Sequence, residues 1–475
     1  MIRNLKSCRL VSCLFISISL SACGFGAEKL SETLKKPFTS TPVEKHSDSA
    51  DEDQISQSIS DILRPNLKVD TSRGIKVGVQ SATIAHPALA ATISNYRANL
   101  ERLKITRAKA GVNLDASVYG GVENLSDKRT GAALVLSANR ILFDGGQTEA
   151  QVAAAQHRVA AAKHNIQVAI DQQALDLAVT WVELDKYERL NALISSRLTI
   201  LDPLIVQLEK VAAAGVGDIT QVASAQRTVT SIRVVQSDVQ ERLQQEKIRF
   251  LNAYGSLPNE IALAGMPPLK DYQKKFNNDT VNDVPALRAG YESYLASEAD
   301  LAYVSGKKKF TVNFEARGSQ PFDESDFDDK VSVGFVARKN FYDSGRLDAE
   351  ISEGEARVQI AADELRALHR EGRNRVQAAK QNIRSMEKLL SIAEENAKTA
   401  RDEIEYLRKQ LVIGESTLES VLSSEARLYE AESKIIEAEA GLLKSKLAVS
   451  AALGRLGENF GITEKMLGDT FNVQF

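Results

Sequence analysis

One pattern occurs twice in this chain, and the repetition restricts the folds open to it. The segment ILFDGG at 141–146 returns as NFYDSG at 340–345, an offset of 199 residues. Gly215 and Gly414 are separated by the same offset. A unit of that length is too long for a solenoid repeat, so the spacing indicates a duplicated half-protein.

The composition favours long helices and argues against one large class of function. The chain has 475 residues with only 10 prolines, and good helix formers such as Ala, Glu and Lys are abundant. Its 60 basic side chains face 63 acidic ones, without the basic excess of a nucleic-acid-binding protein. We therefore expect an elongated or multidomain, largely helical protein that binds no nucleic acid.

The N-terminus predicts export and attachment to a lipid. Arg3, Lys6 and Arg9 precede an apolar stretch at 10–20 that is too short to span a bilayer. The sequence LSAC, which ends at Cys23, resembles a bacterial lipobox, in which the cysteine sulfur carries the lipid. This pattern predicts lipidation, although an ordinary signal peptide with a nearby cysteine is the alternative.

The predicted processing site divides the N-terminal region in two. We expect residues 1–22 to be a lipoprotein signal peptide. Residues 23–74 would then be a lipid-anchored linker, because their Ser, Thr, Asp, Glu and Lys content is typical of flexible segments.

The first repeat is assigned to residues 75–257. Apolar and polar residues alternate at about 112–120, and a second apolar run follows at about 132–143, which predicts two strands. A helical period then holds across 144–254, which predicts a helical hairpin that turns just before Asp218, a plausible N-cap. A helix that begins at His86-Pro87 and reaches about Lys109 is expected to precede the strands.

The second repeat, residues 284–457, has the same order of patterns. Strands are expected at about 310–318 and 330–342, and a helical hairpin at 343–452. The proline-containing segment 258–283 between the repeats and the tail at 458–475 do not follow the repeat. We expect this equatorial segment and the tail to form a small irregular collar.

The first long helix contains a proline that its counterpart lacks. Pro203 would remove one backbone hydrogen bond and clash with the preceding turn, so we predict a kink or break near residue 200. Asp202 could cap the second segment. His157 and His164 lie on one face of the same helix, and we interpret them as solvated side chains because no third metal ligand is near.

Helix length and strand pattern together constrain the assembly. A helix over 144–214 would be ~105 Å long and needs packing partners along its whole length. The strands match the length of tilted membrane β-strands, and a sheet in lipid must close. Four strands cannot close a barrel, so two, three or four copies would have to form 8, 12 or 16 strands. In the first strand of each repeat, the apolar residues would face outward (Val112, Leu114, Phe310, Val312, Phe314). The polar residues between them would face inward (Asn113, Asp115, Thr311, Asn313, Glu315, Arg317).

Over roughly residues 75–457 the sequence resembles the TolC-like outer-membrane channel-tunnel family. The resemblance is carried by FDGG at 143–146, YDSG at 342–345, HPAL at 86–89 and the two hairpin turns. It implies a mainly α fold with a small β part, in which each half contributes two strands and a long helical hairpin. It further implies a homotrimer with a 12-stranded β-barrel continuous with a 12-helix periplasmic α-barrel.

The resemblance also implies a function and its partners. Such a channel is a passive conduit in the outer membrane that exports drugs or polypeptides. Its partners would be a periplasmic adaptor of the membrane fusion type, an inner-membrane ABC or RND transporter, and outer-membrane lipid. A periplasmic adaptor or a structural coiled-coil lipoprotein is the alternative. No catalytic residue, cofactor or metal ion is expected.

Three groups of residues are assigned by this resemblance. The strand-to-helix junctions would contain Phe143, Asp144, Gly146, Tyr342, Asp343 and Gly345. The periplasmic tip that meets the adaptor would contain Gly215, Gly217, Asp218, Gly414 and Glu415. The periplasmic aperture would be lined by Gln221, Glu419, Ser420 and Ser423. The two serines stand where some members of the family carry acidic rings, which argues against a cation-selective acidic gate here.

Overall fold

The computed structural model describes residues 68–123, 129–213, 219–259, 261, 263, 265–273, 282–322, 327–413 and 415–473. These residues belong to one compact unit, Pro65–Phe475. The predicted signal peptide, Cys23 and most of the predicted linker lie outside the described residues, as do four of the predicted tip residues (Gly215, Gly217, Asp218, Gly414).

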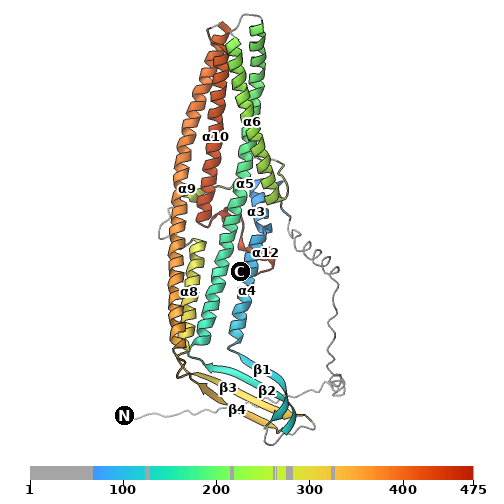
Figure 1. Ribbon diagram of the computed structural model, residues 1–475, viewed down its shortest axis with the longest axis vertical. Coiled ribbons are helices and arrows are strands. Elements are labelled where there is room, and N and C mark those ends of the chain that lie inside the picture. The colour runs from blue at the N-terminus through green and yellow to red at the C-terminus, as the bar shows by residue number, and fades with distance from the viewer. Residues whose placement is uncertain are drawn as a thin grey trace, which may run out of the picture. The chain divides into compact units, whose positions relative to one another are not determined.

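Both parts of this unit contain one helix, two strands and two further helices in the same order, with shorter elements added around them (Figure 1). The first part contains α3 (Ile75–Ala85), α4 (Pro87–Ala108), β1 (Val112–Glu123), β2 (Arg129–Phe143), α5 (Gln147–Ala213) and α6 (Ile219–Tyr254). The second contains η1 (Lys270–Gln273), α8 (Pro285–Gly306), β3 (Thr311–Pro321), β4 (Lys330–Arg338), α9 (Arg346–Ile413), α10 (Leu418–Ala452), α11 (Leu456–Asn459) and α12 (Glu464–Phe471).

The helices lie side by side in a fixed order. Helices α5 and α9 have 67 and 68 residues, which makes each about 100 Å long. The shorter helices α4 and α6 both contact α5, α5 contacts α8 and α10, and these two contact α9. The long helices are therefore packed along their whole length, and α4/α6 and α9 form the two outer edges of the layer.

Helix α4 begins where the sequence predicts it. Pro87 occupies the first turn, and the Nδ1 atom of His86 accepts a hydrogen bond from the Ala88 amide at 3.2 Å. Helix α3, in contrast, is not predicted by its sequence, which contains Gly78 and several β-branched residues. It forms against the core, because Gly78 lies so close to Trp181 that a Cβ atom would come within 2.5 Å of the indole. Tertiary packing here outweighs weak helix propensity.

The four strands form one antiparallel sheet in the order β1-β2-β3-β4. The pairing places Leu114 opposite Ala138 and Asp115 opposite Ser137, so successive residues point to opposite faces. One face is apolar, and its side chains are largely uncovered, Leu114 being 79% exposed. The predicted outward set within the strands (Val112, Leu114, Val312, Phe314) is on this face, and the predicted inward set is on the other.

Strand β4 is shorter than the sequence pattern indicates. It ends at Arg338 instead of about residue 342. The side chain of Asn340 accepts a hydrogen bond from the Tyr342 amide at 3.2 Å, and this local turn competes with strand pairing. The chain therefore leaves the sheet before the YDSG segment.

The largest core cluster lies where the segment after α6 and the C-terminal tail meet the middle of α5. The tail was expected to be irregular, and this is wrong, because it contains the helix α12. Trp181 is fully buried in this cluster and packs edge-on against Phe250 and Tyr254. Its Nε1 atom donates a hydrogen bond of 2.9 Å to the Ile261 carbonyl group. This bond fixes the segment between the two halves of the fold onto the helical layer.

Of the kink or break predicted near residue 200, the break is wrong, because α5 continues as an α-helix through Pro203 to Ala213, whereas a kink stays a prediction. Pro203 is exposed, so the carbonyl group that loses its helical partner can be hydrated. The neighbouring Leu201 is fully buried and packs with Ile194 and Leu198, which holds the helix in place. Asp202 caps no helix and instead pairs with Arg233 of α6 at 3.0 Å.

None of the helices in the described ranges combines the length and the apolar character that crossing a bilayer requires.

Candidate functional site

The first strand-to-helix junction is organised by Asp144, between β2 and α5. Its Oδ1 atom accepts a hydrogen bond from the Gly146 amide at 3.0 Å, and its Oδ2 atom accepts one from the Thr148 amide at 2.6 Å. Partial burial opposes ionisation of Asp144, but the bonds from Thr148 and Gly146 outweigh it and lower the pKa of this carboxyl group. Asp144 thus satisfies amides that the start of the helix leaves unpaired.

The second junction has the same geometry around Asp343. Its carboxylate accepts bonds from the Gly345 amide at 3.2 Å and from the Leu347 amide at 3.0 Å. Both junctions use two successive residues with positive φ, Gly145-Gly146 in the first and Ser344-Gly345 in the second. The flanking Phe143 packs against Phe310 with tilted rings and 4.9 Å between ring centroids, whereas Tyr342 is almost fully exposed.

One difference between the junctions has a steric cause. A Cβ atom on Gly145 would lie 2.7 Å from the Cβ atom of Lys309 and 2.8 Å from the Gly306 carbonyl oxygen, so glycine is required there. The Lys309 side chain also donates to the Gly145 carbonyl group at 3.2 Å. The second junction carries Ser344 at the matching position.

The predicted tip and aperture residues are only partly described. The Glu415 amide donates to the Gln410 carbonyl group at 3.0 Å and closes the end of α9. Ser420 lies in the first turn of α10, where its amide donates to Oγ1 of the N-cap residue Thr417 at 3.2 Å. Glu419 accepts a hydrogen bond from Ser224 of α6, and Ser423 is exposed. Gln221 lies in the first turn of α6.

A buried ion-pair network lies near the tip end of the helical hairpins. Glu425 of α10 is only 1% exposed. Its carboxylate accepts a hydrogen bond from Arg197 of α5 at 3.1 Å and another from Arg408 of α9 at 2.7 Å. One acidic side chain therefore connects α5 of the first hairpin to α9 and α10 of the second.

The network continues one heptad further along α10. Glu432 accepts bonds from Arg197 at 2.5 Å and from Arg401 of α9 at 2.7 Å. Arg197 is thus held between two glutamates. Removing one member of such a group leaves a buried charge uncompensated, which typically costs about 3–5 kcal/mol.

Sequence reasoning missed this network, although a signal is present. Arg197 interrupts the apolar stripe of α5 that contains Ile194, Leu198 and Leu201. Glu425 likewise stands among the buried residues of α10, between Leu422 and Leu428. A basic residue on one apolar stripe and an acidic residue on another indicate helices that pack through a buried ion pair.

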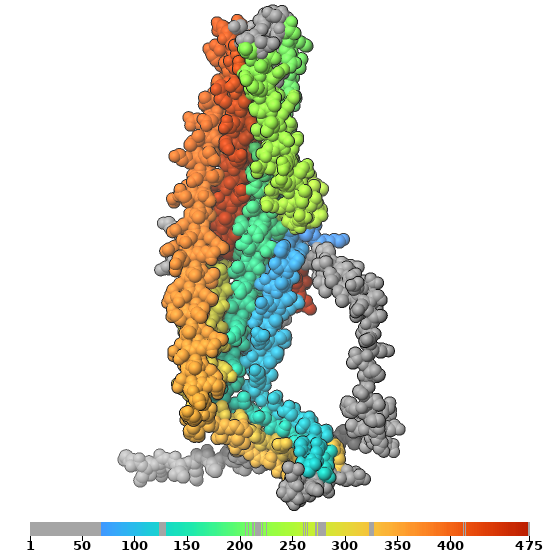
Figure 2. All heavy atoms as spheres, in the orientation of Figure 1, coloured from blue at the N-terminus to red at the C-terminus, as the bar shows by residue number. Residues whose placement is uncertain are grey.

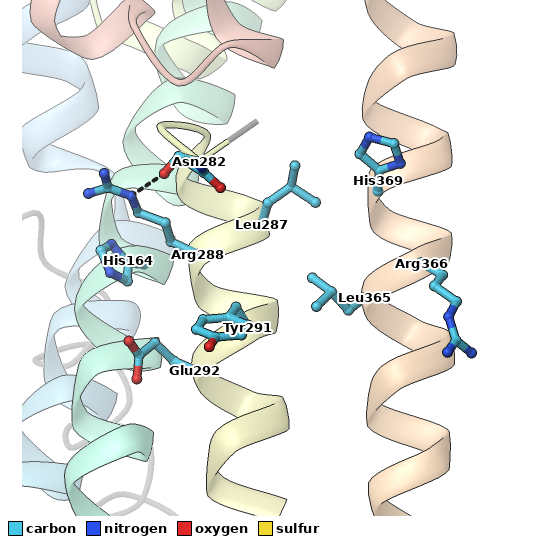
Figure 3. A pocket seen from close by; sticks show the side chains of 9 residues that line it. All are labelled: His164, Asn282, Leu287, Arg288, Tyr291, Glu292, Leu365, Arg366 and His369. Atoms are coloured by element: carbon cyan, nitrogen blue, oxygen red, sulfur yellow. Dashed lines mark hydrogen bonds between the residues drawn. The ribbon is translucent and has the colours of Figure 1, made fainter. Parts of the chain in front are cut away.

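A cavity of about 590 Å³ lies among α5, α8 and α9 (Figure 3). Its lining combines apolar Leu287, Tyr291 and Leu365 with polar side chains that include His164 and His369. Burial, together with the nearby Arg288 charge, lowers the pKa of His164.

The expectation of solvated histidines on α5 is wrong, because α8 packs over this part of the helix. His157 and His164 are both half-buried. The Nδ1 atom of His157 lies 2.7 Å from the Glu292 carboxylate of α8. In the described part of the chain, no three His, Cys, Asp or Glu side chains form a cluster that could hold a metal ion.

Comparisons with known proteins agree with this architecture. Residues 311–455 match the family described as outer membrane efflux protein. The outer membrane efflux protein BepC of Brucella suis is 19% identical over 345 residues, which covers 72% of this chain and 76% of BepC.

Three solved structures share the fold. A membrane protein from Pseudomonas aeruginosa superposes with a TM-score of 0.71 at 15% identity, over 82% of this chain and 91% of that one. The outer membrane protein VceC of Vibrio cholerae gives 0.68 at 17% identity, over 79% and 95% of the two chains. The open state of the MtrE outer membrane channel of Neisseria gonorrhoeae gives 0.69 at 14% identity, over 82% and 92%.

Proposed function

Because the chain belongs to the outer membrane efflux protein family, we propose that three copies of it form a passive conduit through the outer membrane. Each copy would contribute four strands to a 12-stranded β-barrel and its helices to a periplasmic α-barrel. The duplication of the chain would give the three copies a nearly six-fold wall. No catalytic step is assigned to it, and the energy for export would come from its partners.

One observation carries this proposal: the free edges of the sheet and the free edges of the helical layer are formed by elements that are neighbours in the chain. Strands β1 and β4 each have one hydrogen-bonded neighbour within the sheet. Helix α4, which precedes β1 in the chain, lies with α6 at one edge of the helical layer. Helix α9, which follows β4, lies at the other edge. Figure 2 shows α9 as an uncovered surface along one side of the unit. A rotation that joins β4 to β1 of the next copy also joins α9 to α4/α6. A closed ring therefore gives a partner to the free edges of both the sheet and the helical layer.

The exposed apolar face of the sheet supports a place in lipid. Leu114, Val331 and Phe335 on this face are all more than two-thirds exposed in the single chain. The opposite face carries Asp115, Glu315 and Arg317 and would line a water-filled lumen. A soluble adaptor or a coiled-coil lipoprotein, the alternative functions, has no use for such a sheet.

The buried network around Glu425 would hold the periplasmic end closed. It joins α5 of the first hairpin to α9 and α10 of the second, so the hairpins cannot separate without breaking it. We propose that opening parts Arg197 from Glu425 and Glu432. The predicted aperture residues Gln221, Glu419, Ser420 and Ser423 would lie beyond this point.

The tip residues would receive the periplasmic adaptor. We assign this contact to Gly215, Gly217, Asp218, Gly414 and Glu415, and we propose an inner-membrane ABC or RND transporter as the source of drugs or polypeptides. Acylation of Cys23 would fix the chain to the outer membrane. Incorporation of labelled palmitate tests this anchor, and a Cys23→Ala variant that still carries label would contradict it.

The assembly can be tested directly in the outer-membrane fraction. Unheated samples should migrate as trimers on a denaturing gel, and heated samples as monomers. The purified trimer should conduct ions across a planar bilayer. Recovery of the chain only as a soluble monomer would overturn the proposal.

A further inference from the structure

The apolar face of the sheet ends in an isolated arginine. The pairing places Arg140 in one row with Val112, Phe314 and Phe335, all on the apolar face. Arg140 is exposed, and no carboxylate among the described residues pairs with it. An arginine on a lipid-facing surface is costly at the centre of a bilayer but nearly neutral at its interface. This row must therefore lie close to the headgroups, which the guanidinium can reach by extending along the strand.

Two lysines stand at the same end of the sheet. Lys109 follows α4, three residues before β1, and Lys339 directly follows β4. Both are exposed, and neither has an ion-pair partner among the described residues. Lys339 instead lies over the ring of Phe341, with Nζ 5.6 Å from the centroid. Nearby Lys307 and Lys308 are neutralised by Glu350 at 2.9 Å and Asp348 at 3.0 Å.

Aromatic side chains lie at the same end of the sheet as these cations. Phe341 is 89% exposed, and Tyr342 is exposed nearly as much. Phe143 and Phe310 pack against one another at the neighbouring strand ends. Aromatic rings of this kind gather at the interface between the hydrocarbon and the headgroups of membrane β-barrels. The cations and the rings therefore indicate the same depth.

We propose that Lys109, Arg140 and Lys339 form a binding surface for the anionic headgroups of phospholipids at the helix end of the sheet. This inference rests on the proposed function, since it requires the sheet to lie in a membrane. The apolar face would receive the acyl chains, and the three cations would contact phosphate groups. Charge complementarity selects anionic lipids such as phosphatidylglycerol over zwitterionic lipids of the same chain length.

The test compares lipids on the purified trimer in detergent. Association of phosphatidylglycerol and of phosphatidylcholine with identical acyl chains is measured by native mass spectrometry, and inorganic phosphate serves as a headgroup without chains. A double variant, Arg140→Gln with Lys339→Gln, removes two cations. A matched control, Lys76→Gln with Lys465→Gln, removes two exposed lysines from α3 and α12, far from the sheet. Arg140→Lys keeps the charge.

We expect the wild type, the control and Arg140→Lys to prefer phosphatidylglycerol over phosphatidylcholine. In the double variant this preference should fall about five-fold for each charge removed. Equal association of both lipids with the wild type, or an equal loss in the control, would overturn the inference. Tight binding of phosphate alone would replace it with a free-anion site. A chain that forms no trimer before lipid is added contradicts the proposed function instead, and the lipid surface falls with it.

Discussion

Arg197 of α5 and Glu425 of α10 are 228 residues apart in the sequence and are joined by a hydrogen bond of 3.1 Å in the interior of the helical layer. Each has a second partner, Glu432 for the arginine and Arg408 for the glutamate. The contact connects the two hairpins of one chain at a level close to their tips. It is therefore both a structural element and the strongest candidate for a gate.

Replacing Glu425 with Gln should affect both the stability of the chain and the closure of the proposed gate. The amide keeps the shape of the side chain but leaves Arg197 and Arg408 with less negative charge, so we expect a loss of about 3 kcal/mol in stability. If three copies form the proposed channel, that channel should also conduct more ions in a planar bilayer, because the hairpins separate more easily. Thermal unfolding followed by circular dichroism measures the first effect, and single-channel recording measures the second.

A matched control lies on the exposed face of α9. Glu405→Gln breaks the exposed pair with Lys409 at 2.8 Å, and such pairs contribute little to stability. Glu405→Gln should leave both the unfolding temperature and the conductance unchanged. A Glu425→Gln channel with wild-type conductance would remove the network from the gating mechanism.

Asp171 predicts a dependence of stability on pH. Burial raises the pKa of Asp171 to about 7, against the hydrogen bonds from the Gly457 amide and Gln167 and the charge of Arg455. The folded state therefore binds more protons than the unfolded state between about pH 4 and 7. The contribution of this group to stability is complete below pH 4 and is lost as the pH rises through 7, by up to about 4 kcal/mol.

Asp171→Asn should remove this pH dependence. The amide oxygen can still accept the Gly457 hydrogen bond, which is 2.8 Å long in the wild type, without the cost of burying a charge. Denaturation at pH 5 and at pH 8 can be followed through Trp181, the single tryptophan of the chain, which is buried in the adjoining core. We expect the variant to be more stable than the wild type at pH 8 and no more stable at pH 5. The same difference at both pH values would contradict this account.

Local patterns in the sequence predicted the features that depend on neighbouring residues. Alternation at about 112–120 and 310–318 predicted two strands, because side chains of a strand point alternately to two faces. The Asp-Gly-Gly segment predicted a strand-to-helix junction, and the structure shows why: its carboxylate caps the helix start and its glycines adopt positive φ, regardless of what packs on the turn. The resemblance to a family added the prediction of a trimer, which no local pattern specifies.

The features that were missed depend on contacts between distant residues. Helix α3 forms because Gly78 fits against Trp181, more than 100 residues away. The continuity of α5 through Pro203 depends on the packing of Leu201 and its neighbours, which holds the segment despite a lost hydrogen bond. The partners of Arg197 lie on α10, and the alignment of α10 with α5 is not specified by the sequence of either helix.

The two junctions should differ in their tolerance of a methyl group. Gly145→Ala and Gly345→Ala both place a side chain at positive φ, which costs about 1–2 kcal/mol. Gly145→Ala adds a collision with Lys309 and the Gly306 carbonyl group, whereas no atom lies within 4 Å of the place that a Cβ atom on Gly345 would occupy. We expect a clearly larger drop in the thermal unfolding midpoint for Gly145→Ala. Equal drops in the two variants would show that the first junction can relax.

Pro203 provides a last prediction, in the stabilising direction. Pro203 sits inside α5, where it cannot donate to the carbonyl group of Thr199, and it is exposed to solvent. Pro203→Ala restores that donor and removes the clash of the ring with the preceding turn, which should raise stability by up to about 3 kcal/mol. The reference substitution Thr199→Ala, one turn earlier on the exposed surface, should change stability by much less. A lower unfolding midpoint for Pro203→Ala would mean that the proline fixes a bend on which the packing of Leu201 depends.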